Sequence, residues 1–132
     1  MRGETDLNNL LRHCKPELNA GEYVFCSVDA GNLPSNVDPM GSFRELEGTT
    51  LILPRDQADA LGLPYSFVSA WITLSVHSAL EAVGLTAAVS QALAESGISC
   101  NVVAACFHDH LFVRVGEAQR ALAVLQNLSG RY

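Results

Sequence analysis

Apolar positions follow a helical period in some segments of the chain and alternate with polar positions in others. Apolar residues at i, i+3, i+4 and i+7 predict a short helix over 5–14, which Pro16 ends. The run EYVFCSV is rich in β-forming residues and predicts a strand over 22–28. Segment 29–41 concentrates proline, glycine, asparagine and aspartate, so it is predicted to be a loop.

The next segments continue this first half of the chain. The run FRELEGTTLIL over 43–53 predicts extended structure interrupted at Gly48, either as a bulge or as a tight hairpin. A short helix is predicted over 55–61, with Gly62 placed to end it. The sequence LGLP at 61–64 is then a connector between two halves of the chain.

The second half has clearer patterns. Strict alternation over 70–77 predicts a strand, and five apolar residues on one face predict a helix over 84–96. The continuous apolar run 98–107 predicts a buried strand, and 109–115 predicts another strand after a tight turn. A last amphipathic helix is predicted over 117–128.

The predicted order in the second half is strand, helix, strand, strand, helix. Two strands that flank a helix are expected to be parallel, and the next two form a hairpin. This is an α+β, ferredoxin-like βαββαβ pattern without its fourth strand, which the first half could supply. The sequence therefore predicts two interlocked ferredoxin-like halves, divided as 1–64 and 65–132.

Charge and composition exclude several classes of protein. The chain has 132 residues, of which 48% are hydrophobic and 17% charged, so it can bury a core and is not a disordered tail. Its net charge is -6, and it has no basic stripe of the kind that binds nucleic acid. Residues 1–66 carry ten acidic and five basic side chains, so this half is expected to be the more solvated one.

The expected compartment is the cytoplasm. No apolar run approaches the roughly 20 residues that span a bilayer, and the N-terminal sequence has no apolar signal region. The four cysteines are then expected to be reduced and mostly buried. None of them forms a CxxC pair, which argues against a zinc ribbon.

The sequence FHDHLFV carries the most reactive side chains of the second half. Cys106, His108 and His110 would share one face of an unbroken strand and could bind zinc or copper. A hairpin turn at His108 and Asp109 would destroy that alignment, and Asp109 would then bond its own backbone or contact a ligand. The turn is the favoured interpretation, so no metal or other cofactor is expected.

Other pairs of reactive residues do not indicate catalysis. The serine that follows a histidine at 77–78 points to the opposite strand face, and no GxSxG motif is present. Glu45 and Glu47 would share one strand face, but Arg44 and Arg55 are near in sequence. A solvated, partly paired strand edge is therefore expected there rather than an acid–base pair.

The loop before the helix 84–96 offers a binding site for a small zwitterion. The first turn of a helix has free backbone N–H groups that suit a carboxylate, and Gly84 would allow a ligand to approach the backbone. Glu81 and Asp109 are candidates to bind an ammonium group. In the simpler interpretation, Gly84 only shapes the turn.

The stretch ITLSVHSALEAVGLTAAVSQALAESGISCNVVA over 72–104 resembles the ACT domain, a small regulatory fold that binds amino acids. Together with FRELEGTTLIL and FHDHLFV, the resemblance covers almost the whole chain. The chain is most similar to small bacterial ACT-domain proteins of unknown function. Its layout is also similar to the tandem ACT modules of cytosolic arginine sensors.

The resemblance implies a non-enzymatic, cytoplasmic regulatory protein that holds an amino acid between ACT units and acts through its oligomeric state or a protein partner. A homodimer is expected because ferredoxin-like sheets often pair edge to edge, and the charge and hydropathy described above leave no role for nucleic acid or membrane. Carried onto this chain, the ligand-binding residues are Ser78, Leu80, Glu81, Ala82, Val83, Gly84, Asn101, His108 and Asp109. An ACT-like interaction module without a ligand is the alternative, and a small metal-dependent enzyme is a third.

Overall fold

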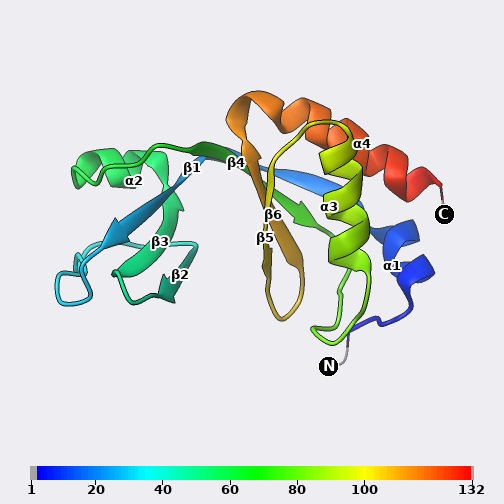
Figure 1. Ribbon diagram of the computed structural model, residues 1–132, viewed down its shortest axis with the longest axis horizontal. Coiled ribbons are helices and arrows are strands. Elements are labelled where there is room, and N and C mark those ends of the chain that lie inside the picture. Colours follow the sequence, from blue (N-terminus) through cyan, green and yellow to red (C-terminus); the bar gives the residue numbers. More distant parts are fainter. Residues whose placement is uncertain (1–2, 132) are drawn as a thin grey trace. The chain divides into compact units, whose positions relative to one another are not determined.

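The computed structural model describes residues 3–131, which form two compact units (Figure 1). Within these residues, unit 1 comprises 3–20 and 70–131, and unit 2 comprises 21–69. The elements in chain order are α1 (Leu7–His13), β1 (Pro16–Val28), β2 (Gly41–Arg44), β3 (Thr49–Pro54), α2 (Arg55–Ala60), β4 (Val68–Leu74), α3 (Leu85–Glu95), β5 (Cys100–Ala104), β6 (Asp109–Arg114), the 3-10 turn η1 (Val115–Glu117) and α4 (Ala118–Gly130). Every helix within 3–131 is too short or too polar to cross a bilayer.

Unit 1 is a four-stranded sheet with helices α1, α3 and α4 packed on one face. Its strand order is β1-β4-β6-β5, which is the order of a ferredoxin-like unit. Inward-facing residues of β4 and β6 pack against Leu10 of α1, Val89 of α3 and Leu125 of α4. The helical and alternating periods in the sequence therefore predict this core correctly.

β1 supplies the strand that the second half lacks. The Ser75 N–H donates to the carbonyl of Lys15 at 3.0 Å, and Asn19 Nδ2 donates to the carbonyl of Trp71 at 3.2 Å. These bonds fasten the start of β1 beside β4 within unit 1. The prediction that the first half supplies the fourth strand is confirmed. β1 begins at Pro16 rather than at residue 22, because pairing with β4 extends a segment that has little β propensity of its own.

Unit 2 is built on the antiparallel order β2-β3-β1, and Ser69 at the start of β4 donates its hydroxyl to the Tyr23 carbonyl at 2.8 Å. Its core joins alternate residues of β1 and β3 to Ala58 of α2. The loop 29–40 stands where a ferredoxin-like unit has its first helix. Both units thus use β1 and β4, and the predicted interlocked α+β fold is confirmed.

The predicted interruption at Gly48 is a hairpin turn. Glu45 and Gly48 exchange two backbone hydrogen bonds, of 2.9 and 3.3 Å, between β2 and β3. Gly48 has a φ of +152°, and a Cβ there would lie 2.7 Å from the carbonyl oxygen of Val28. Glycine is therefore required by both backbone conformation and space.

One prediction about the second half is wrong. The apolar run 98–107 does not form a buried strand, because β5 covers only Cys100–Ala104 and lies at the edge of the sheet. β6 lies between β4 and β5, so the two strands that flank α3 are not neighbours. Only the β5 side chains that face the helices are partly covered, and an apolar run alone does not distinguish a central strand from an edge strand.

Candidate functional site

The predicted ligand loop leaves the sheet after β4 and leads into α3. Its base is anchored, because the Glu4 N–H donates to the His77 carbonyl at 2.9 Å and the Ala79 N–H donates to the Glu4 carbonyl at 3.0 Å. Ser78 is buried at this anchor. Leu80 and Val83 are 68% and 81% exposed, so the tip of the loop is open to solvent.

Gly84 stands at the N-terminus of α3 with a φ of +101°. No side chain caps this helix, so the first backbone N–H groups of α3 have no side-chain acceptor. A Cβ on Gly84 would lie 3.0 Å from a methyl carbon of Leu7. The positive φ therefore favours glycine at this position, and the side chain of Leu7 covers one side of it.

The turn between β5 and β6 lies beside the base of this loop. The Ala105 N–H donates to the His108 carbonyl at 3.1 Å, so a hairpin turn is present as predicted, but it spans 105–108 and not His108 and Asp109. His108 Nδ1 bonds the carbonyl of Val76 at 3.2 Å, and the rings of His77 and Phe107 lie 5.2 Å apart. Residues 76–78 and 105–108 are thus held together at one end of unit 1.

Asp109 is the first residue of β6 rather than part of the turn, and it is only 8% exposed. No residue within 3–131 donates a hydrogen bond to its carboxyl group. Burial raises the pKa of Asp109, and the nearby His110 and His108 oppose that effect. Burial, together with the charge of Asp109, raises the pKa of the Cys14 thiol to about 12. Within 3–131 no fully buried side-chain oxygen or nitrogen lacks a hydrogen-bond partner, so the Asp109 carboxyl keeps some contact with solvent and is open to an incoming group.

Asn101 lies elsewhere on the hairpin. It pairs with Phe112, three positions along the ladder from the pair Ala104 and Asp109, and its Nδ2 donates to the Phe112 carbonyl at 3.4 Å. The structure therefore brings the base of the loop, His108 and Asp109 together but leaves Asn101 apart from them. Glu81 is exposed on the loop. The register of the β5–β6 hairpin separates Asn101 from His108 and Asp109. The spacing of these residues in the sequence does not determine that register.

His110 belongs to a network that the sequence did not indicate. Trp71 Nε1 donates to His110 Nδ1 at 3.0 Å, and Thr73 Oγ1 lies 3.1 Å from the same nitrogen. Burial lowers the pKa of His110, and the nearby His108 adds to that effect. Cys106 is exposed in the turn. Across 3–131, no group of three or more His, Cys, Asp or Glu side chains could hold a metal ion.

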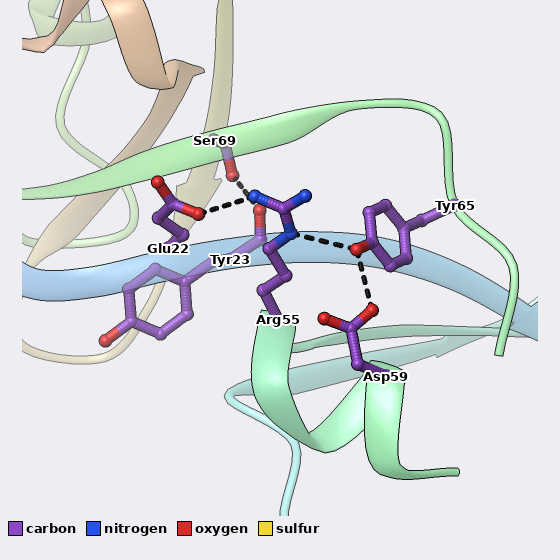
Figure 2. Close-up of polar contacts among 6 residues, drawn as sticks. All are labelled: Glu22, Tyr23, Arg55, Asp59, Tyr65 and Ser69. Atoms are coloured by element: carbon purple, nitrogen blue, oxygen red, sulfur yellow. Dashed lines mark hydrogen bonds and ion pairs between the residues drawn. The ribbon is translucent and has the colours of Figure 1, made fainter. Parts of the chain in front are cut away.

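Unit 2 holds a polar network around Arg55 (Figure 2). Arg55 Nη1 donates to Glu22 Oε1 at 2.8 Å, and Arg55 Nε donates to the Tyr65 hydroxyl at 2.9 Å. The Tyr65 hydroxyl in turn donates to Asp59 Oδ1 at 2.7 Å. Hydrogen bonds with Tyr65 and Glu22 raise the pKa of Arg55. These contacts connect β1, α2 and the connector before β4.

The expected pairing of Glu45 and Glu47 with nearby arginines is not found. Both glutamates lie in the turn between β2 and β3 rather than on one strand face, and Glu45 accepts a hydrogen bond from Thr50 Oγ1. Arg55 pairs with Glu22 instead. Glu22 and the buried Val24 are two positions apart on β1, so their side chains lie on the same face of the strand. This alternation is the sequence signal that could have placed Glu22 beside α2.

Comparison with known families gives two matches. One ACT-domain family matches residues 2–70, and a second ACT-domain family matches residues 66–127. No curated protein sequence matches the chain. The two matches together span almost all of it, so both halves carry an ACT pattern.

Solved structures agree with this pattern. A protein of unknown function from Vibrio cholerae, described as a possible transport protein, is 48% identical with a TM-score of 0.83; the match covers 93% of this chain and 95% of that one. A protein from Agrobacterium tumefaciens is 21% identical with a TM-score of 0.69, covering 89% and 90%. The ligand-free regulatory subunit of aspartate kinase from Thermus thermophilus shares the fold at 9% identity, with a TM-score of 0.64 and coverage of 86% and 95%.

Proposed function

The chain belongs to the ACT-domain family, and on this premise we propose that it is a non-enzymatic regulatory protein that binds an amino acid. ACT domains are typically regulatory modules that bind small ligands, and the fold is shared with a regulatory subunit of aspartate kinase. The four cysteines are free thiols, which suits the reducing cytoplasm as its place of action. In this proposal, binding of the amino acid changes either the contact with a protein partner or the oligomeric state of the protein.

The observations that support the proposal are the Asp109 carboxyl, which accepts no hydrogen bond from residues 3–131, and the start of α3, which no side chain caps; both belong to unit 1. An amino acid has both groups that these features lack: an ammonium for a carboxylate, and a carboxylate for free N–H groups. The remaining contacts come from the loop. The proposed ligand-binding residues are Ser78, Leu80, Glu81, Ala82, Val83, Gly84, His108 and Asp109.

Asn101 enters the proposed site from a second copy of the chain. It lies on β5, whose outer edge has no neighbouring strand within the described sheet. The segment 98–107 contains no charged residue and no proline, so nothing in it opposes pairing of two β5 strands. A homodimer joined at this edge would complete the site with residues from both copies.

An interaction module without a ligand is the second candidate function. Leu80, Val83 and Phe107 are large apolar side chains exposed at the same end of unit 1. Exposed apolar groups of this kind favour a protein contact. In that case the loop would pack flat against a neighbour and no amino acid would bind.

The test is thermal unfolding of the protein in the presence of each of the twenty common amino acids at millimolar concentration. A ligand at 100 times its dissociation constant stabilises the native state by about 2.7 kcal/mol, since it binds only that state. For a chain of this size we expect one amino acid to raise the unfolding temperature by roughly 5 °C or more.

Asp109→Asn is expected to reduce that response strongly, because a neutral amide can accept a hydrogen bond from an ammonium group but cannot form an ion pair with it. Asp29→Asn, which changes an exposed carboxyl in unit 2, is the matched control and should keep the response. If none of the twenty amino acids shifts the transition, the interaction module becomes the better function. If Asp109→Asn responds like the control, the ligand binds elsewhere.

A further inference from the structure

β2 is the outer strand of unit 2, and its free edge can accept another strand (Figure 1). Glu45 and Gly48 exchange both of their backbone hydrogen bonds. Along an antiparallel ladder, every second residue pair exchanges backbone hydrogen bonds. Phe43 and Thr50, two positions from Glu45 and Gly48, are therefore also a hydrogen-bonded pair. Ser42 and Arg44 therefore direct their N–H and C=O groups away from β3, toward the open edge.

This edge is unusually apolar for an exposed surface. Phe43 is 73% exposed, Leu46 is fully exposed and Met40 is also exposed. We call residues 40–47 the β2 rim. Exposed large apolar side chains gathered on one short segment mark interaction sites in proteins that are otherwise well packed. The unpaired backbone groups and the apolar side chains occur on the same few residues.

The charge around the β2 rim indicates what would bind there. Arg44 at the end of the strand is the one basic residue of the β2 rim, whereas Asp38, Glu45 and Glu47 flank the strand, and unit 2 carries seven acidic and two basic residues. Two copies paired through β2 would bring these carboxylates together, which is unfavourable. The contrast with the uncharged β5 edge argues against a second copy at β2 and for a partner of opposite charge.

We propose that the β2 rim is a docking surface for a basic segment of another protein, which binds in extended conformation as an added strand. Backbone bonds to Ser42 and Arg44 would supply affinity, apolar side chains of the segment would pack on Phe43 and Leu46, and its lysines or arginines would face Glu45 and Glu47. This goes beyond the amino acid site, which lies in unit 1, and identifies the surface through which a regulatory protein could reach its target.

The probe for this surface is a short synthetic peptide of alternating lysine and valine, with a glutamate and valine peptide as its counterpart. Isotope-labelled protein is titrated with each peptide, and backbone amide shifts are followed by NMR. We expect the basic peptide to bind, to shift the amides of Ser42 and Arg44, and to weaken as salt is added, because the attraction is screened. The acidic peptide should cause no such shifts.

Two variants separate strand addition from general charge attraction. Ser42→Pro removes an outward N–H without removing a bond to β3, and it should weaken peptide binding about tenfold, since proline cannot donate to an added strand. Glu47→Lys should weaken binding by a similar factor. Glu95→Lys in α3 makes the same change of net charge and should leave peptide affinity unchanged.

The proposal is overturned if Ser42→Pro leaves affinity unchanged, or if Glu47→Lys and Glu95→Lys weaken it equally. It is also overturned if sedimentation shows that Ser42→Pro dissociates a dimer, because a second copy would then occupy this edge. The amino acid response of unit 1 is measured on the same Ser42→Pro protein. Its presence or absence reports on the amino acid site alone, so the two proposals fail independently.

Discussion

At the scale of single residues, Asp109 combines features that oppose each other. It lies on the inward face of β6 next to the buried Cys14, where an apolar residue would be expected to pack better. Burial makes its charged form unfavourable, and no hydrogen bond within 3–131 offsets that cost. Such local conflicts are concentrated at functional sites, because there a ligand can relieve them.

This conflict has a measurable dependence on pH. The pKa of Asp109 is raised in the folded protein above its ordinary value of 3.8, so the folded state holds this proton more tightly than the unfolded state. The stabilising contribution of the protonated group is present below that value and is lost as the pH rises through the folded pKa. Asp109→Asn mimics the protonated form, so at pH 7 we expect it to have a larger free energy of unfolding than the wild type.

Urea unfolding at neutral and acidic pH measures this difference. Other carboxyl groups titrate in both proteins, so the difference between the two isolates Asp109, and it should shrink as the pH falls toward 3.8. A variant that is less stable than the wild type at pH 7 would contradict the prediction. It would mean that the carboxylate receives stabilising bonds in the folded state.

At the scale of elements, local sequence signals predicted where helices and strands end better than they predicted which strands lie next to one another in the sheet. Pro16 and Gly97 mark where α1 and α3 stop, and the interruption at Gly48 is a hairpin turn. Strand pairing and register determine three other features: the start of β1, the edge position of β5 and the separation of Asn101 from Asp109. These are set by segments distant in sequence, so no local pattern contains them.

α2 is the element whose attachment depends most on polar contacts. It is a helix of six residues, and Arg55 connects it to Glu22 of β1 and to Tyr65. We expect Arg55→Gln to speed hydrogen exchange of the α2 amides while β5 and β6 stay as protected as before, because the loss is confined to unit 2. The unfolding temperature should fall only slightly, since the pair is half exposed.

The matched control is Arg44→Gln, which removes an exposed arginine from β2 that makes no described side-chain bond. Native-state hydrogen exchange of both variants, read residue by residue, separates the two cases. Equal rates in α2 for Arg55→Gln and Arg44→Gln would show that the network does not hold the helix in place.

At the scale of the whole molecule, counting strands was enough to predict the interlocked fold. The second half had one strand too few for a ferredoxin-like sheet, and β1 supplies it. The same counting could not find the Arg55 network or the β2 rim. Both depend on which side chains a sheet places at its margin, and a strand count contains no such information.

The proposed homodimer is testable at the β5 edge. Val103→Lys places a charge on this strand at a side chain that is already exposed, so the fold should persist while edge-to-edge pairing is opposed. In sedimentation velocity we expect the wild type to sediment as a dimer and the variant as a monomer. A dimer that survives Val103→Lys would rule out pairing through β5.

The sharing of β1 and β4 limits how this chain can be divided. A gene fragment encoding 65–132 would contain α3, α4 and three strands, but β4 would have lost its neighbour β1, and the core would have lost Leu10 and Leu11 of α1. Its product would carry a bare strand edge and an open apolar cavity, which together favour aggregation. The two family matches, over residues 2–70 and 66–127, therefore do not mark two pieces that could be expressed and purified separately.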